Sequence, residues 1–295
     1  MTIKIGANPI IWTNDDLQSI GAGTTLEVCL TQAKLAGIQG MELGHKFPVT
    51  APELTAALEP HGLEFVTGWW STNLLTHDAA TEIAALKDRV ALLKGTGSQI
   101  CIACETSNAI HGHFDIPLSQ RPTLAEKEWK LFAQRLTTVA DYLAGEGIDL
   151  VYHHHMGTIV QSRQDIDRLM SLTGPSVKLL LDTGHALWGE SDPAELARTY
   201  RHRIGHFHGK DIRPFKRAQA DVTEWSFLRA MLAGVFTVPG DGCIEYGRIF
   251  REIPDYSGWV IIEAEQDPEV AHPLVYARMG RNYLVDTLIQ TGHIS

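Results

Sequence analysis

The chain has 295 residues, of which 44% are hydrophobic and 20% charged, which is enough apolar surface for one large α/β core. Its formal net charge of -10 argues against a nucleic-acid partner, because such a partner requires clustered Lys and Arg. The sequence has no apolar stretch near the roughly 20 residues of a membrane span, and its start lacks the apolar run of a signal peptide. We therefore expect a cytoplasmic protein with no membrane partner.

Eight short apolar runs recur along the chain, and most of them are followed by a segment with helical periodicity. Each run is bounded by Gly, Pro or polar residues, which are typical of turns. We predict strands at about residues 3–11, 38–44, 64–70, 99–104, 150–155, 178–182, 204–208 and 259–265.

The segments between these runs carry helix start signals. Thr24 or Thr25 is expected to cap a helix over residues 26–36, because a threonine side chain can accept a hydrogen bond from a free backbone N–H. By the same reasoning, Thr123 is expected to cap a long helix over residues 124–144.

Strands that alternate with helices predict a parallel sheet, which either closes as a (β/α)8 barrel or stays open and doubly wound. The count of eight units favours the TIM barrel, and so does the absence of a G-x-G-x-x-G run after the first strand. We expect one domain over residues 1–295. In a closed barrel the loops after the strands share one face, so residues distant in sequence converge there.

Ionisable residues are concentrated at the predicted strand ends. The set comprises Glu42, Glu105, His153, His155, Asp182, His185, His206, His208, Asp211, Glu263 and Glu265. Because side chains alternate across a strand, His153 shares a face with His155, and Glu263 shares one with Glu265. The pattern does not tell which face points into the barrel.

Carboxylates and imidazoles gathered in a cleft are costly unless a cation or hydrogen bonds compensate them. A single histidine at a strand end is more often structural, but the joint occurrence on four strands favours a metal site. Mixed Asp, Glu and His ligands suit Mn, Co, Fe, Zn or Mg. For Glu42 and Glu105 a structural role is left open, because the rim also needs acceptors for loop amides.

Several longer motifs resemble the xylose-isomerase-like TIM-barrel superfamily and, within it, the inosose dehydratases of inositol catabolism. The resemblance spans nearly the whole chain and is carried by residues 8–16 (NPIIWTNDD), 152–158 (YHHHMGT), 181–185 (LDTGH), 206–213 (HFHGKDIR), 234–242 (GVFTVPGDG) and 258–268.

The resemblance implies a substrate and a metal centre. The substrate would be 2-keto-myo-inositol, from which water is eliminated, and the cofactor a divalent ion, with Mn or Co favoured and Zn, Fe or Mg left open. Carried over by position, the ligands are Asp182, His208 and Glu263, with His153 as the fourth. Sugar epimerases of the superfamily have a Glu at the strand-five position, where this chain offers His153 or His155, so the sequence departs from a paired-Glu epimerase.

We expect the ion to bind the ketone and stabilise the enolate formed when a neighbouring proton leaves. His155 and Glu265 are the predicted acid and base, assisted by His185. The predicted substrate-binding residues are Asn8, Trp12, Lys210 and Arg213, although Trp12 could instead pack in the core and Lys210 and Arg213 could be solvated. The partner is thus a small polyol ketone, and assembly into a homo-oligomer is left open.

Three other functions share parts of this pattern. An isomerase or epimerase of a keto-inositol or ketose would reprotonate the same enolate. A nuclease like endonuclease IV uses similar strand-end ligands, but the acidic charge argues against it. A sugar-binding barrel without catalysis would bind its ligand without a metal.

Overall fold

The computed structural model describes residues 3–295. Within them the main sheet contains nine strands in the order β3-β2-β1-β11-β8-β7-β6-β5-β4, and its strand pairs are parallel. The strands are β1 (Ile3–Ala7), β2 (Gly40–Met41), β3 (Glu64–Phe65), β4 (Trp69–Thr72), β5 (Ile100–Glu105), β6 (Asp149–His153), β7 (Val177–Asp182), β8 (Ile204–Gly209) and β11 (Gly258–Ile262).

The two edges of this sheet meet in one segment of the chain. Strands β3 and β4 are the two ends of residues 64–72; β3 pairs with β2 and β4 pairs with β5. Between them, Leu43 N donates to Thr67 O at 2.8 Å and Thr67 Oγ1 donates to Ile100 O at 2.5 Å. The eight predicted strand positions are therefore all occupied, and the predicted (β/α)8 barrel is confirmed.

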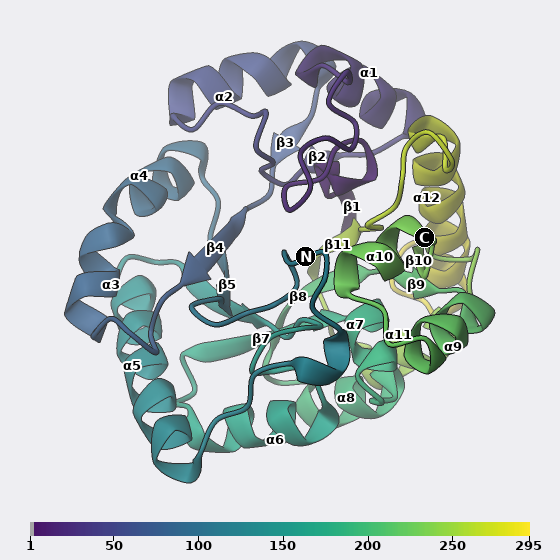
Figure 1. Cartoon of the computed structure of the whole chain (residues 1–295). Coiled ribbons are helices and arrows are strands. Elements are labelled where there is room, and N and C mark those ends of the chain that lie inside the picture. Colours follow the sequence, from purple (N-terminus) through teal and green to yellow (C-terminus); the bar gives the residue numbers. More distant parts are fainter. Residues whose placement is uncertain (1–2) are drawn as a thin grey trace.

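Helices surround the ring of strands, most of them on its outside (Figure 1). They are α1 (Leu26–Ala36), α2 (Ala51–Leu58), α3 (Ala79–Ala85), α4 (Lys87–Thr96), α5 (Glu126–Gly145), α6 (Arg163–Leu172), α7 (Thr183–Trp188), α8 (Pro193–Tyr200), α9 (Pro214–Val222), α10 (Phe227–Leu232), α11 (Tyr246–Glu252) and α12 (Pro273–Gln290), with short 3-10 turns at Pro9–Ile11, Glu59–His61 and Leu118–Gln120. None of the helices in residues 3–295 is long and apolar enough to cross a membrane.

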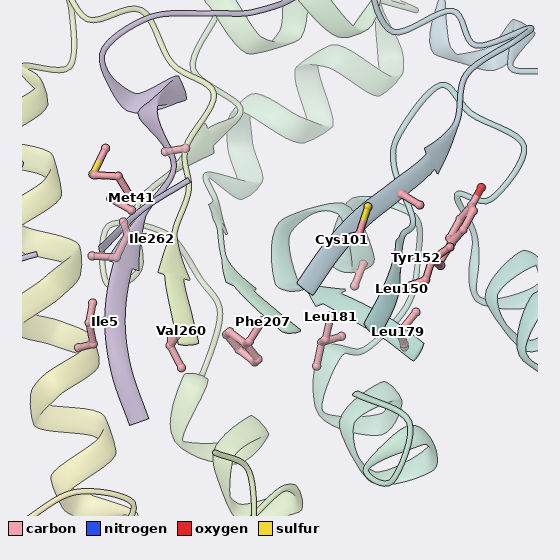
Figure 2. Close-up of a cluster of buried hydrophobic side chains, with 14 of the residues drawn as sticks. Ile5, Met41, Cys101, Leu150, Tyr152, Leu179, Leu181, Phe207, Val260 and Ile262 are labelled. Atoms are coloured by element: carbon pink, nitrogen blue, oxygen red, sulfur yellow. The ribbon is translucent and has the colours of Figure 1, made fainter. Parts of the chain in front are cut away.

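Alternate strand residues face the helices and form the larger core. Figure 2 shows Leu179, Leu181 and Phe207 among these buried side chains. Phe207 stacks on Phe250 of α11, with ring centroids 5.1 Å apart. The intervening residues face the barrel interior, where a small apolar cluster of Ile102, Val151 and Leu180 lies.

Local signals account for several element boundaries. Thr25 caps α1 as predicted, because its hydroxyl accepts from Val28 N at 3.2 Å. The predicted cap at Thr123 is wrong: α5 begins at Glu126, and the Glu128 carboxylate accepts from Ala125 N at 2.7 Å.

The first strand ends earlier than predicted, and so do the strands predicted at residues 38–44, 150–155 and 259–265. β1 ends at Ala7, because the Asn8 side chain accepts from Ile10 N at 2.9 Å and starts a 3-10 turn at Pro9. β6 ends at His153, after which the chain turns back so that His155 N donates to Val160 O at 3.0 Å.

An excursion after β8 lies over the carboxyl end of the barrel. It comprises β9 (Asp211–Ile212), α9, α10 and β10 (Phe236–Thr237), and β10 pairs antiparallel with β9. Its apolar side chains, among them Phe227 and Phe236, form a second core with Met156 and Trp188. This excursion gives the rim of the barrel an apolar backing.

Candidate active site

The carboxyl ends of four strands bring their inward side chains into one buried cluster, which we call the four-residue cluster. His153 ends β6, Asp182 ends β7, His208 lies in β8 and Glu263 follows β11. Each offers one ligand atom, and these atoms all lie within 4.8 Å of one another. The structure thus brings together the four residues predicted as metal ligands.

The cluster contains a buried carboxylate oxygen that other protein groups do not satisfy. His153 Nε2 lies 3.6 Å and His208 Nδ1 3.8 Å from Asp182 Oδ2, both too long for hydrogen bonds. His208 Nδ1 and Glu263 Oε2 contact each other directly, whereas Asp182 Oδ2 has no hydrogen-bond partner among the described residues. A buried oxygen of this kind is costly unless a cation binds it, and two imidazoles with two carboxylates are a donor set suited to a divalent transition metal. The residues therefore fit a metal ion.

Both carboxyl groups of the cluster are ionised, as metal binding requires. Burial alone would raise the pKa of Asp182, but the Lys210 ammonium and His153 lower it to about 2. Burial likewise opposes ionisation of Glu263, whereas His208 and Lys210 hold its pKa well below the ordinary value.

The run Asp182-Thr183-Gly184-His185 orients one ligand and joins two strands. Asp182 Oδ1 caps α7 by accepting from His185 N at 2.8 Å, which leaves Oδ2 for the cluster. The Thr183 hydroxyl donates to Lys210 O at 2.7 Å. A Cβ on Gly184 would lie 2.7 Å from Lys210 Cγ, so only glycine lets the lysine stem pass. The motif therefore fixes the ends of β7 and β8 against each other.

Glu42 lies against the opposite side of the same histidine. Its Oε1 atom is 2.8 Å from His206 Nε2 and 3.1 Å from His208 Nε2, and Asn8 Nδ2 donates to Oε2 at 2.8 Å. With Nε2 engaged by Glu42, His208 presents Nδ1 to the cluster. Glu105 differs, because it accepts from the loop groups Leu74 N and Ser107 N at 2.7 and 3.0 Å, which is a structural role.

Lys210 is completely buried beside the cluster. Its Nζ atom lies 2.8 Å from Glu263 Oε1, 2.6 Å from Glu265 Oε2 and 2.9 Å from His185 Nε2. Its ammonium group is therefore fully engaged by neighbouring side chains, and Lys210 does not line the cavity described below. Because these carboxylates surround it, Lys210 neutralises charge behind the site, so surface solvation of this residue is wrong.

His155 and Glu265 form a pair next to the cluster. His155 Nε2 lies 3.4 Å from Glu265 Oε1, and His155 Nδ1 lies 2.8 Å from the carbonyl oxygen of Met156. Because a carbonyl oxygen only accepts hydrogen bonds, Nδ1 must carry a proton. In a neutral His155 ring the free lone pair is therefore on Nε2. Burial lowers the pKa of His155 well below its ordinary value and raises the pKa of Glu265.

A small cavity opens on these groups. Its volume, counted as the space open to the centre of a water molecule, is about 90 Å³, which is room for several waters. It is lined by Asn8, Ile10, Asp15, Asp16, Leu43, Trp69, Ile102, His111, His153, His155, His208, Glu263 and Glu265.

Besides Lys210 and Asp182, three other residues expected at the site lie outside this lining. Trp12 is buried in the main core, where its indole N–H donates to Gln32 at 2.9 Å. Arg213 pairs with Asp241 at 2.6 Å and holds the turn that follows β10. His185 lies behind His155, with ring centroids 3.8 Å apart.

Sequence reasoning missed Asp15, Asp16 and His111, because it considered strand ends only. Asp15 and Asp16 lie in the β1–α1 loop, and His111 lies in the β5–α5 loop. A signal was present in the run Asn14-Asp15-Asp16 and in the His-Gly-His sequence at 111–113, but nothing in the sequence places either loop over the barrel.

Comparisons with known proteins agree on a family. A sequence model of the xylose isomerase-like TIM barrel family matches residues 30–284. The rhizopine catabolism protein MocC of Rhizobium meliloti is 42% identical, with 96% of this chain and 88% of that protein covered. An inosose dehydratase of Clostridium botulinum is 40% identical over 96% of each chain. The crystal structure of the IOLI protein with a bound zinc atom has a TM-score of 0.69 at 16% identity, covering 98% of this chain and 99% of that one.

Proposed function

The chain belongs to the xylose isomerase-like TIM barrel family and, within it, to the inosose dehydratase group, and we propose from this membership and the site that it eliminates water from 2-keto-myo-inositol. The relatives' names support a dehydratase, that is a hydro-lyase, of inositol catabolism. The observation that carries the proposal is the four-residue cluster with its unpartnered Asp182 oxygen, next to an acid–base pair in one cavity.

His153, Asp182, His208 and Glu263 would hold a divalent metal ion. When bound, the ion supplies a Lewis acid that polarises the ketone of the substrate. Bound zinc in the structurally similar IOLI protein agrees with a divalent ion in this fold, and the identity of the ion here is an open choice among Mn, Co, Zn, Fe and Mg.

His155 takes the proton from the carbon beside the ketone. Its Nε2 lone pair faces the cavity, because Nδ1 donates to the backbone. The C–O bond at the next carbon breaks, and the departing hydroxyl receives a proton and leaves as water. Glu265 can pass the proton taken by His155 to this hydroxyl, because Glu265 Oε1 lies 3.4 Å from His155 Nε2. The product is an enol that tautomerises to the dione.

The residues behind the pair orient it and exclude water. Lys210 donates to Glu265 at 2.6 Å and so directs Oε1 toward His155. The rings of Phe227 and Phe236 lie 5.0 Å from those of His155 and His185, respectively. An apolar backing of this kind strengthens the electrostatic interactions within the site.

The test compares metal-reconstituted protein with chelated protein, each incubated with 2-keto-myo-inositol. The proposal expects loss of one water by mass spectrometry and a new ultraviolet absorbance, both only with metal. A product of unchanged mass and altered stereochemistry would instead identify an epimerase. Unchanged substrate in the presence of every candidate ion would refute both.

A further inference from the structure

Two loops, rather than strand ends, supply part of the cavity wall outside the four-residue cluster. His111, from the β5–α5 loop, and Asp16, from the β1–α1 loop, both line the cavity. His111 Nε2 lies 3.7 Å from Asp16 Oδ1. The mechanism above uses neither side chain, although both face the same space as His155 and Glu265.

The position of His111 depends on the run 153–158. Gly157 has a φ of +78°, and a Cβ there would lie 3.0 Å from His111 N. Ile110 N donates to Gly157 O at 2.9 Å, which joins the β5–α5 loop to the β6–α6 loop. The His111 ring then lies 4.9 Å from the ring of His155 and 6.5 Å from that of Trp69. Gly157 therefore lets the imidazole enter the cavity.

The loop that carries Asp16 is fixed just as firmly. Lys46 Nζ donates to three of its carbonyl oxygens, those of Gly21, Ala22 and Thr24, at 2.9, 2.9 and 2.6 Å. Asn14 Oδ1 accepts from Asp16 N at 2.9 Å and so sets the direction of the next residues. Asp15 is held by His45, whose Nδ1 atom lies 2.7 Å from Asp15 Oδ1. Both loops thus present their side chains from rigid supports.

The two side chains are separated by a distance that one hydroxyl group can bridge. At 3.7 Å, His111 Nε2 and Asp16 Oδ1 are too far apart to bond directly. One oxygen can lie about 2.8 Å from both atoms, accepting from the imidazole and donating to the carboxylate. An alcohol hydroxyl is the substrate group that does both.

We propose that His111 and Asp16 determine specificity by binding a hydroxyl of a polyol ring in the part of the cavity outside the four-residue cluster. The inference rests on the proposed function, in which a ketone is bound at that cluster and the remaining ring hydroxyls point elsewhere. A ring that lacks the matching hydroxyl would leave a partly buried imidazole and carboxylate unpaired, which is why such a pair discriminates.

The experiment measures the affinity of the metal-loaded protein for myo-inositol by titration calorimetry. This polyol lacks the ketone, so binding is read without turnover. His111→Ala and Asp16→Ala are each expected to weaken binding by roughly 10- to 100-fold, as for loss of a hydrogen bond to a charged group. The matched controls are His113→Ala and Gln18→Ala, exposed positions in the same two loops, which should bind as the wild type does.

Monodeoxy-inositols separate direct contact from a structural effect. One of them should bind the wild type more weakly than myo-inositol does, and that difference should vanish in His111→Ala and Asp16→Ala. Unchanged affinity in both variants, or a wild type that binds no polyol, would overturn the inference. Dehydration of 2-keto-myo-inositol by the wild type is assayed alongside. Turnover with unaffected variants refutes the inference alone, whereas weakened variants without turnover refute the proposed function alone.

Discussion

Replacement of Lys210 by Met tests how the buried charges of the site are balanced. The substitution keeps the stem that passes Gly184 and removes only the ammonium group, which lies 2.8 Å from Glu263 and 2.6 Å from Glu265. Removing one partner of a buried ion pair costs about 3–5 kcal/mol, because it leaves charge uncompensated. At roughly 2 °C per kcal/mol for a chain of this size, Tm should fall by about 6–10 °C in chelated protein.

The matched control is Lys94→Met. Lys94 pairs with Glu146 at 2.7 Å, but the two side chains are 53% and 33% exposed, so solvent already screens the pair. Its loss should cost at most about 1 kcal/mol, or about 2 °C. Thermal unfolding followed by circular dichroism compares the two variants. Equal Tm values would refute the reasoning, and so would a Lys210→Met deficit that bound metal does not reduce, since the ion neutralises Glu263, one of the carboxylates that Lys210 contacts.

Three other predictions follow from the site and the core. Asp182→Ala should abolish metal binding while leaving a folded barrel, which metal analysis and circular dichroism together would check; a fully loaded variant would contradict the ligand set. Glu42→Gln should lower metal affinity by about 10- to 100-fold, because it weakens the contact that holds His208 in place, and competition with a chelating dye would measure it. Ellman's reagent should find one fast thiol in the folded protein, at exposed Cys243, and four after denaturation, since burial raises the pKa of a core thiol such as Cys29 to about 12; four fast thiols would show that the core opens.

The order of elements was readable from the sequence because hydrophobic periodicity and turn residues are local signals. Eight apolar runs predicted eight strand positions, and Thr25 predicted the start of α1. The cap of α5 was predicted wrongly, because the Glu128 carboxylate binds Ala125 N, a backbone N–H that a cap at Thr123 would bind. Motifs around Asp182 and His208 likewise indicated a metal site, because a barrel brings the residues at the carboxyl ends of its strands together on one face.

What the sequence determined, then, was which residues share a strand face; which face is inside was decided by tertiary structure alone. Both faces of a barrel strand are buried, so alternation carries no label for the interior. The register between β7 and β8 also shifts at Leu179 and Leu180, just before the pairs that include His206 and His208. The local sequence pattern does not reveal this shift. Lys210 and Arg213 are three residues apart and chemically alike, yet one is buried among carboxylates and the other pairs with Asp241. Contacts between distant loops, such as Gly157 with Ile110 and His111, bring further groups to the cavity, because close approach in space depends on the whole fold.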